Sequence, residues 1–263
     1  MRSPAADKRP AVLNEILTLD IYRFFMIVAR VGAAMMLLPG FSGQLVSTRI
    51  RLLLALVVSL VLLPVVGALY PPLPRHVGAL LLLIMGEILV GIYLGVLTQA
   101  LMAALNIAGT IIGFQSGLTN AFSFDAVAEQ QGSTLTAFLS TTALVAIFAT
   151  DLHHLMLRAL ADSYATFVPG QPLPLDDFAS TLAHTLSGSF GVGVRLASPV
   201  LAFGLIFYAG LGLLSRLAPQ IQVFFVALPL QVIAGLSMLM IALPLIIMIF
   251  LRWFEAGLIP FLR

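Results

Sequence analysis

Residues 77–106 read VGALLLLIMGEILVGIYLGVLTQALMAALN, a run in which Glu87 is the single charged side chain. About 20 apolar residues in a helix are enough to cross a hydrocarbon core roughly 30 Å thick. The run is longer than that and contains no proline. It therefore predicts a transmembrane helix.

The rest of the chain has the same character. Of 263 residues, 60% are hydrophobic and 9% are charged, and the mean hydropathy is +1.10, whereas a soluble domain carries about 25% charged residues. Stretches that approach or exceed the length of a span lie at 16–38, 50–69, 77–106, 134–160, 190–214 and 222–250. We expect an all-α, polytopic integral membrane protein with about six helical segments arranged as hairpins.

The domain organisation follows from the same pattern. We expect residues 1–15 to form a polar N-terminal tail and residues 16–263 to form a single membrane-embedded domain. Residues 175–189 are more polar than a span, and Asp176 or Asp177 is suited to cap the start of a helix there. This stretch predicts a short interfacial helix.

The composition argues against several classes of protein. Without cysteine there is no disulfide or thiolate chemistry, and a dispersed net charge of +2 does not suit nucleic-acid binding. No HExxH, GxSxG or Walker-type phosphate loop occurs. His153 and His154 follow Asp151, but adjacent histidines on a helix point about 100° apart and would need further ligands to hold one ion. We expect no enzymatic activity, no metal site and no cofactor.

Charged residues interrupt several of the apolar stretches. Glu87 lies in the middle of the third stretch and Arg195 near the start of the fifth. Because an ionisable group in a membrane is costly, it usually meets a partner or an aqueous cavity. Both residues are therefore predicted to make polar contacts within the membrane. They would either form a structural ion pair or hydrogen-bonded helix contact, or line a conduit. Arg23 and Arg30 are seven residues apart on one helix face and are expected to face protein or lipid headgroups.

Glycines recur after the third stretch. Gly109, Gly113 and Gly117 are spaced by four, so a helix would present a stripe without side chains. The following residues, 118–124, read LTNAFSF and carry no strong helix signal. Two interpretations remain open: a helix-packing stripe followed by an ordinary loop, or a flexible segment placed against a pore.

Residues 215–229 read SRLAPQIQVFFVALP. A proline breaks or bends a helix, and the amides beside it are polar. The segment predicts a tight hairpin followed by a kinked helix. The residues assigned to this hairpin are Pro219, Gln220, Gln222, Phe224 and Pro229.

Three blocks of the sequence resemble the FliR family of flagellar type III export-gate membrane proteins, whose injectisome counterpart is called SctT. They are AGTIIGFQSGLTNA at 108–121, DLHHLMLRALADSYATFV at 151–168, and the hairpin block at 215–229. Length and hydropathy agree over essentially the whole chain. This chain departs from the family pattern at Ala126, where a proline is common, at Leu152, where a glycine is expected, and at Gln222, where asparagine is frequent.

The resemblance implies a helical hetero-oligomeric pore in the bacterial inner membrane, at the flagellar basal body. The implied partners are FliP-like, FliQ-like and FlhB-like subunits and the lipid bilayer, and the implied cargo is unfolded flagellar protein. It also implies that the glycine-rich segment projects into the conduit as a plug. The residues that match this plug are Gly113, Phe114, Gln115, Ser116, Gly117, Leu118, Thr119, Asn120, Ala121 and Phe122.

Two other functions remain as alternatives. The equivalent subunit of a virulence-type injectisome would share the fold and mechanism. A secondary transporter would be of a different class and predicts inverted repeats with matching broken helices. No convincing internal repeat is found, so the export gate is the preferred prediction.

Overall fold

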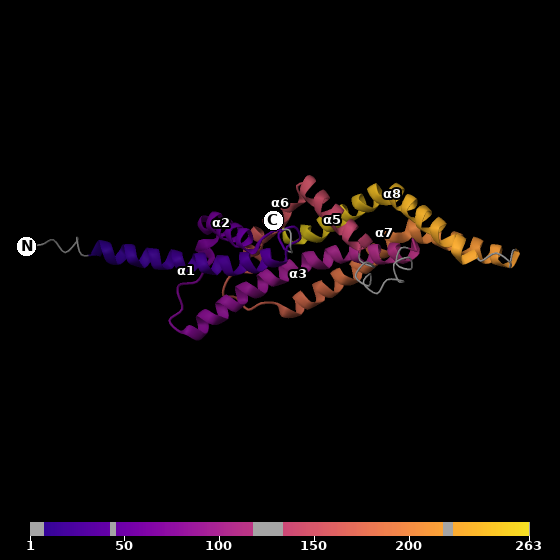
Figure 1. Ribbon diagram of the computed structural model, residues 1–263. Coiled ribbons are helices and arrows are strands. Elements are labelled where there is room, and N and C mark those ends of the chain that lie inside the picture. Colours follow the sequence, from indigo (N-terminus) through magenta and orange to yellow (C-terminus); the bar gives the residue numbers. More distant parts are fainter. Residues whose placement is uncertain (1–7, 43–45, 118–133, 218–222, 263) are drawn as a thin grey trace, which may run out of the picture. The chain divides into compact units, whose positions relative to one another are not determined.

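The computed structural model describes residues 8–42, 46–117, 134–217 and 223–262, with side chains from residue 19 onward in the first range and from residue 227 onward in the last. Every regular element in these ranges is helical, which confirms the predicted all-α class (Figure 1). The elements are α1 (Lys8–Leu37), α2 (Thr48–Val66), η1 (Gly67–Leu69), α3 (Val77–Gln115), α5 (Thr134–Ala149), α6 (Leu152–Thr166), α7 (Leu175–Leu217), α8 (Val223–Leu258) and η3 (Ile259–Phe261).

By length and composition, four helical stretches can cross a membrane. They are Thr48–Leu69, Val77–Gln115, Leu175–Leu217 and Ala227–Phe261, and the broken pair α5 and α6 could supply a fifth. Within the described residues the chain is thus a polytopic helical protein with four or five candidate spans rather than about six. The first predicted stretch, which carries Asp20, Arg23 and Arg30, is not among them.

Residues 175–189 do not form a separate interfacial helix, so that prediction is wrong. They are the first part of α7, whose first turn holds Asp176 and Asp177. Carboxylates in the first turn stabilise the N-terminal end of any helix, short or long, so these aspartates mark a helix start without fixing its length. At 43 residues, α7 is about 65 Å long, roughly twice the hydrocarbon thickness.

The described chain divides by its contacts into two compact units. The first contains the described residues of 1–99, 154–180 and 258–263, and the second contains the described residues of 100–153 and 181–257. Helices α3 and α7 each contribute to both units. α1 already begins at Lys8, inside the predicted polar tail.

In the first unit, α1 packs beside α2 (Figure 1) and closely against the first part of α3. A Cβ on Gly91 would collide with the backbone carbonyl of Arg30 and lie 2.9 Å from Cβ of Ala33. Tyr93 stacks on Phe178 with ring centroids 3.9 Å apart. The spacing of Gly91 and Gly95 therefore serves helix packing, as small residues do where two helices approach closely.

This contact leads to a matched prediction in one helix. Gly91→Ala is expected to destabilise the protein by about 1–3 kcal/mol, because the added methyl meets backbone that cannot rotate away. Gly78→Ala is the control, since its Cβ would meet nothing within 4 Å, and alanine favours a helix by about 0.5–1 kcal/mol over glycine. The melting temperatures of the two detergent-solubilised variants are compared, with size-exclusion chromatography as the readout of the protein that remains folded. Equal melting temperatures would contradict this account of Gly91.

Small residues also mark the contacts of the second unit. A Cβ on Gly109 of α3 would lie 2.6 Å from Cα of Thr136 in α5. A Cβ on Gly188 of α7 would lie 2.6 Å from the indole ring of Trp253 in α8. Ser189 Oγ donates to the carbonyl of Ala100 at 2.7 Å. These helices approach closely because glycine and serine occupy the points of contact.

Pro199 lies inside α7 and removes one hydrogen bond from that helix. The carbonyl that loses its donor is that of Arg195, four residues earlier. Ser198 Oγ donates to this carbonyl at 2.8 Å. The freed carbonyl thus has a local hydrogen-bond donor, as a helix in an apolar medium requires.

Candidate functional site

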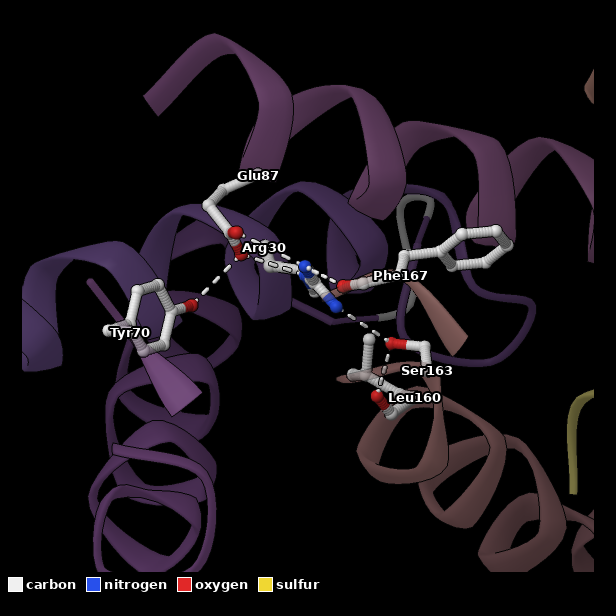
Figure 2. A network of polar contacts seen from close by, with 6 residues as sticks. All are labelled: Arg30, Tyr70, Glu87, Leu160, Ser163 and Phe167. Atoms are coloured by element: carbon white, nitrogen blue, oxygen red, sulfur yellow. Dashed lines mark hydrogen bonds and ion pairs between the residues drawn. The ribbon is translucent and has the colours of Figure 1, made fainter. Parts of the chain in front are cut away.

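Glu87 forms a buried ion pair with Arg30 in the first unit (Figure 2). Arg30 Nε donates to Oε2 at 2.7 Å and Nη2 donates to Oε1 at 3.1 Å. The two residues are 1% and 2% exposed, so water takes little part in their solvation. A two-point guanidinium–carboxylate pair is the geometry in which two buried charges compensate each other best.

Further polar contacts surround the pair (Figure 2). Arg30 Nη1 donates to Ser163 Oγ at 3.3 Å, and Nη2 donates to the carbonyl of Phe167 at 2.9 Å. Tyr70 Oη donates to Glu87 Oε2 at 2.9 Å. The guanidinium carbon lies 4.0 Å from the centre of the Tyr164 ring. The network therefore joins α1, α3, α6 and the segments that follow η1 and α6.

Tyr70 lies just beyond the candidate span Thr48–Leu69. Burial raises the pKa of its hydroxyl above the usual value, and the neighbouring Tyr164 and Glu87 raise the pKa further. The hydroxyl consequently keeps its proton at physiological pH. It remains a donor to Glu87 throughout that range.

A pocket of about 600 Å³ opens beside the ion pair. Its lining includes Arg30 and Glu87 together with residues of the proline-containing segments 71–74 and 168–173. Apart from the pair, the lining is mostly apolar. The pocket borders the ion pair but supplies neither a nucleophile nor a metal-binding set of side chains.

The two predicted intramembrane contacts lie in different surroundings. The partner of Glu87 is Arg30, which spacing had grouped with Arg23. Arg23 is partly exposed, with Nη1 3.6 Å from Asp20 Oδ1, whereas Arg30 is buried. Arg195 is exposed on α7, in the second unit, and its role stays a prediction.

The predicted plug begins at the end of α3. Helix α3 ends at Gln115, and Gly117 follows with a φ of +71°. The Gly117 N–H donates to the carbonyl of Phe114 at 3.2 Å, as happens where a left-handed glycine terminates a helix. Phe114 is 59% exposed. Residues Leu118 to Phe122 lie outside the described residues, so the plug stays a prediction.

Gly117 is therefore not the third member of a helical stripe. Gly109 and Gly113 lie within α3, but the helix ends before Gly117. Spacing alone suggested one continuous face because glycine is permitted both in a helix and at its end.

Most of the predicted hairpin also lies outside the described residues. This holds for Pro219, Gln220, Gln222 and the side chain of Phe224. Pro229 lies within α8, where it is exposed.

The break between α5 and α6 holds one group of potential metal ligands. Asp151 has a φ of +60°, and Asp151, His153 and His154 each place one ligand atom within 4.8 Å of the others. Helical spacing alone did not predict this proximity, because Asp151 lies outside the helix. That this protein holds no metal stays a prediction.

The fold and these sites define a polytopic helical membrane protein with a buried charge network and a capped helix end. Residues 21–257 match the sequence model of the family described as bacterial export proteins, family 1. The match covers most of the chain, and the chain belongs to this family.

Curated relatives agree over nearly the whole length. The chain is 39% identical over 230 residues to the flagellar biosynthetic protein FliR of Caulobacter vibrioides, covering 88% of this chain and 92% of that one. It is 32% identical over 226 residues to the protein of that name from Escherichia coli, covering 85% of each chain. With the counterpart from Pectobacterium carotovorum it shares 30% identity over 227 residues, or 86% of each.

Proposed function

We propose that this chain is a core subunit of a flagellar type III export gate in the bacterial inner membrane. The observation that carries the proposal is the agreement, over almost the full length, with relatives whose name is flagellar biosynthetic protein FliR. In this role the chain forms part of a conduit for unfolded flagellar proteins and performs no chemical reaction.

The exposed apolar side chains support a location in a membrane and in contact with other subunits. On α2, Val57, Val61 and Val65 are each at least 59% exposed, and on α8 Met240 and Ile241 are each 76% exposed. Such apolar faces need lipid or another subunit to cover them. FliP-like, FliQ-like and FlhB-like subunits are the proposed protein partners.

The glycine-rich segment from Gly113 to Phe122 is the proposed plug of the conduit. Its described part supports this role through two features. α3 ends there with a glycine in a conformation that few other residues adopt, and Phe114 offers an exposed aromatic ring. A segment that closes a pore by filling it and excluding water requires bulk rather than charge.

Deletion of the gene in its own bacterium tests this function. We expect loss of swimming and loss of secreted hook and filament proteins, both restored by a plasmid copy. Assembly is measured in parallel by purifying the complex in mild detergent and identifying its subunits. Normal swimming combined with loss of injectisome secretion would contradict the flagellar assignment, and normal secretion by both systems would contradict an export role.

A further inference from the structure

A buried glutamine of α8 contacts the end of α3 within the second unit. Gln231 is 4% exposed. Its Nε2 donates to the carbonyl of Gln115 at 3.0 Å and to Tyr208 Oη at 2.8 Å. Gln115 is the last residue of α3, and the last four carbonyls of a helix have no partner within it. Gln231 supplies one of these missing donors.

Three more residues of α7 and α8 enclose the same helix end. Gly204 lies one turn before Tyr208, and Gly235 lies one turn after Gln231. A Cβ on Gly204 would overlap the side-chain amide of Gln115, and a Cβ on Gly235 would lie 2.8 Å from Cα of Ser116. We call Gly204, Tyr208, Gln231 and Gly235 the helix-end socket.

The Gln231 amide also faces Gly117. A Cβ on Gly117 would lie 3.0 Å from Gln231 Cδ and 3.1 Å from Nε2. Each of the last three described residues of this segment, 115 to 117, thus has its own neighbour in the helix-end socket. A buried amide without partners would be unfavourable. The free carbonyl at the end of α3 provides the hydrogen-bond acceptor that makes burial of Gln231 favourable.

We propose that the helix-end socket is a positioning site that fixes the end of α3, with Gln231 as its principal polar residue. The hydrogen bond to Gln115 and the close approach of Gly204 and Gly235 determine where the chain leaves the helix. The consequence for export rests on the proposed function, because the proposed plug begins at Gly113. The anchoring itself does not depend on that function.

Hydrogen–deuterium exchange on the purified complex tests the anchoring. Gln231→Met keeps the length of the side chain but removes the donor. We expect the amides of Ser116 and Gly117, which bond to the carbonyls of Ile112 and Phe114, to exchange about tenfold faster, because one buried carbonyl loses its donor. Exchange at the wild-type rate would overturn the proposal.

Gln99→Met is the matched control. Gln99 Nε2 donates at 2.6 Å to the carbonyl of Leu37, the last residue of α1, so the same chemistry is removed at another helix end. Exchange at Ser116 and Gly117 should remain unchanged in this variant. Equal acceleration by both substitutions would mean general loosening and would overturn the proposal. If Gln231→Met does not assemble, Tyr208→Phe removes only the hydroxyl and should accelerate exchange by no more than about threefold.

Gln231→Glu separates positioning from packing. An ionised carboxylate only accepts, whereas a protonated one donates as the amide does. After correction for intrinsic rates, protection of Ser116 and Gly117 should recover as the pH falls in Gln231→Glu and stay constant in Gln231→Met. Identical pH profiles would overturn the role of the donor. If Gln231→Met alters exchange but deletion of the gene leaves secretion intact, the two proposals separate. The helix-end socket would then stand, and only the proposed function would be contradicted.

Discussion

Replacing Glu87 with leucine is expected to destabilise the protein by about 3–5 kcal/mol, because it leaves the buried Arg30 without its counter-charge. Arg30 loses both carboxylate oxygens, and Tyr70 loses its acceptor. Glu87→Gln should cost less, since one amide oxygen still accepts from Arg30 or Tyr70. Thermal denaturation of the solubilised complex, with subunit composition as a second measurement, ranks the two variants.

The double variant Arg30→Leu/Glu87→Leu provides the control for charge. Removing both members leaves no uncompensated charge, so it should be more stable than Glu87→Leu alone. A double variant whose loss equals the sum of the two single losses would contradict the coupling. Equal stability of Glu87→Leu and the wild type would contradict a structural role for the ion pair.

Replacing Gly117 with valine is expected to cost about 2–4 kcal/mol at the end of α3. The left-handed conformation costs a residue with a Cβ about 1–2 kcal/mol, and crowding against Gln231 adds about 1–2 kcal/mol. We expect reduced secretion of flagellar proteins and raised ion conductance across membranes that contain the assembled complex, because the helix end is displaced.

Two further substitutions isolate the causes. Gly117→Asn should be milder than Gly117→Val, since asparagine tolerates the left-handed conformation while the crowding remains. Gly212→Val is the control within α7, where a Cβ would meet nothing within 4 Å, and it should leave secretion and conductance unchanged. Wild-type conductance and secretion in assembled Gly117→Val would remove Gly117 from the gating role.

The composition predicted the helical membrane class because apolar length is a property of each segment by itself. Glu87 was identifiable for the same reason, as a charge inside an apolar run. Its partner was not, because Arg30 lies 57 residues away and the pairing depends on how α1 packs on α3. Gln231 is the single side-chain amide of α8, so the sequence alone marks it as unusual. Its partners are known only from the packing of α3, α7 and α8.

The ends of helices were harder to predict than their cores. Asp176 and Asp177 indicated a helix start correctly, but no residue between them and the next stretch ends the helix, so α7 continues to Leu217. The end of α3 has no proline to mark it. A left-handed glycine ends it instead, and glycine spacing alone cannot distinguish a packing stripe from a helix end.

The order of synthesis adds a requirement to the network around Arg30. The residues that neutralise and solvate Arg30 are translated later, Glu87 by 57 positions and Ser163 by 133 positions. At about 5–20 residues per second, the arginine waits roughly 3–11 s for its carboxylate and about 7–27 s for its serine. During that interval α1 carries a cation with neither in place. The polar contacts that compensate Arg30 therefore form only after α3 and then α6 have been synthesised.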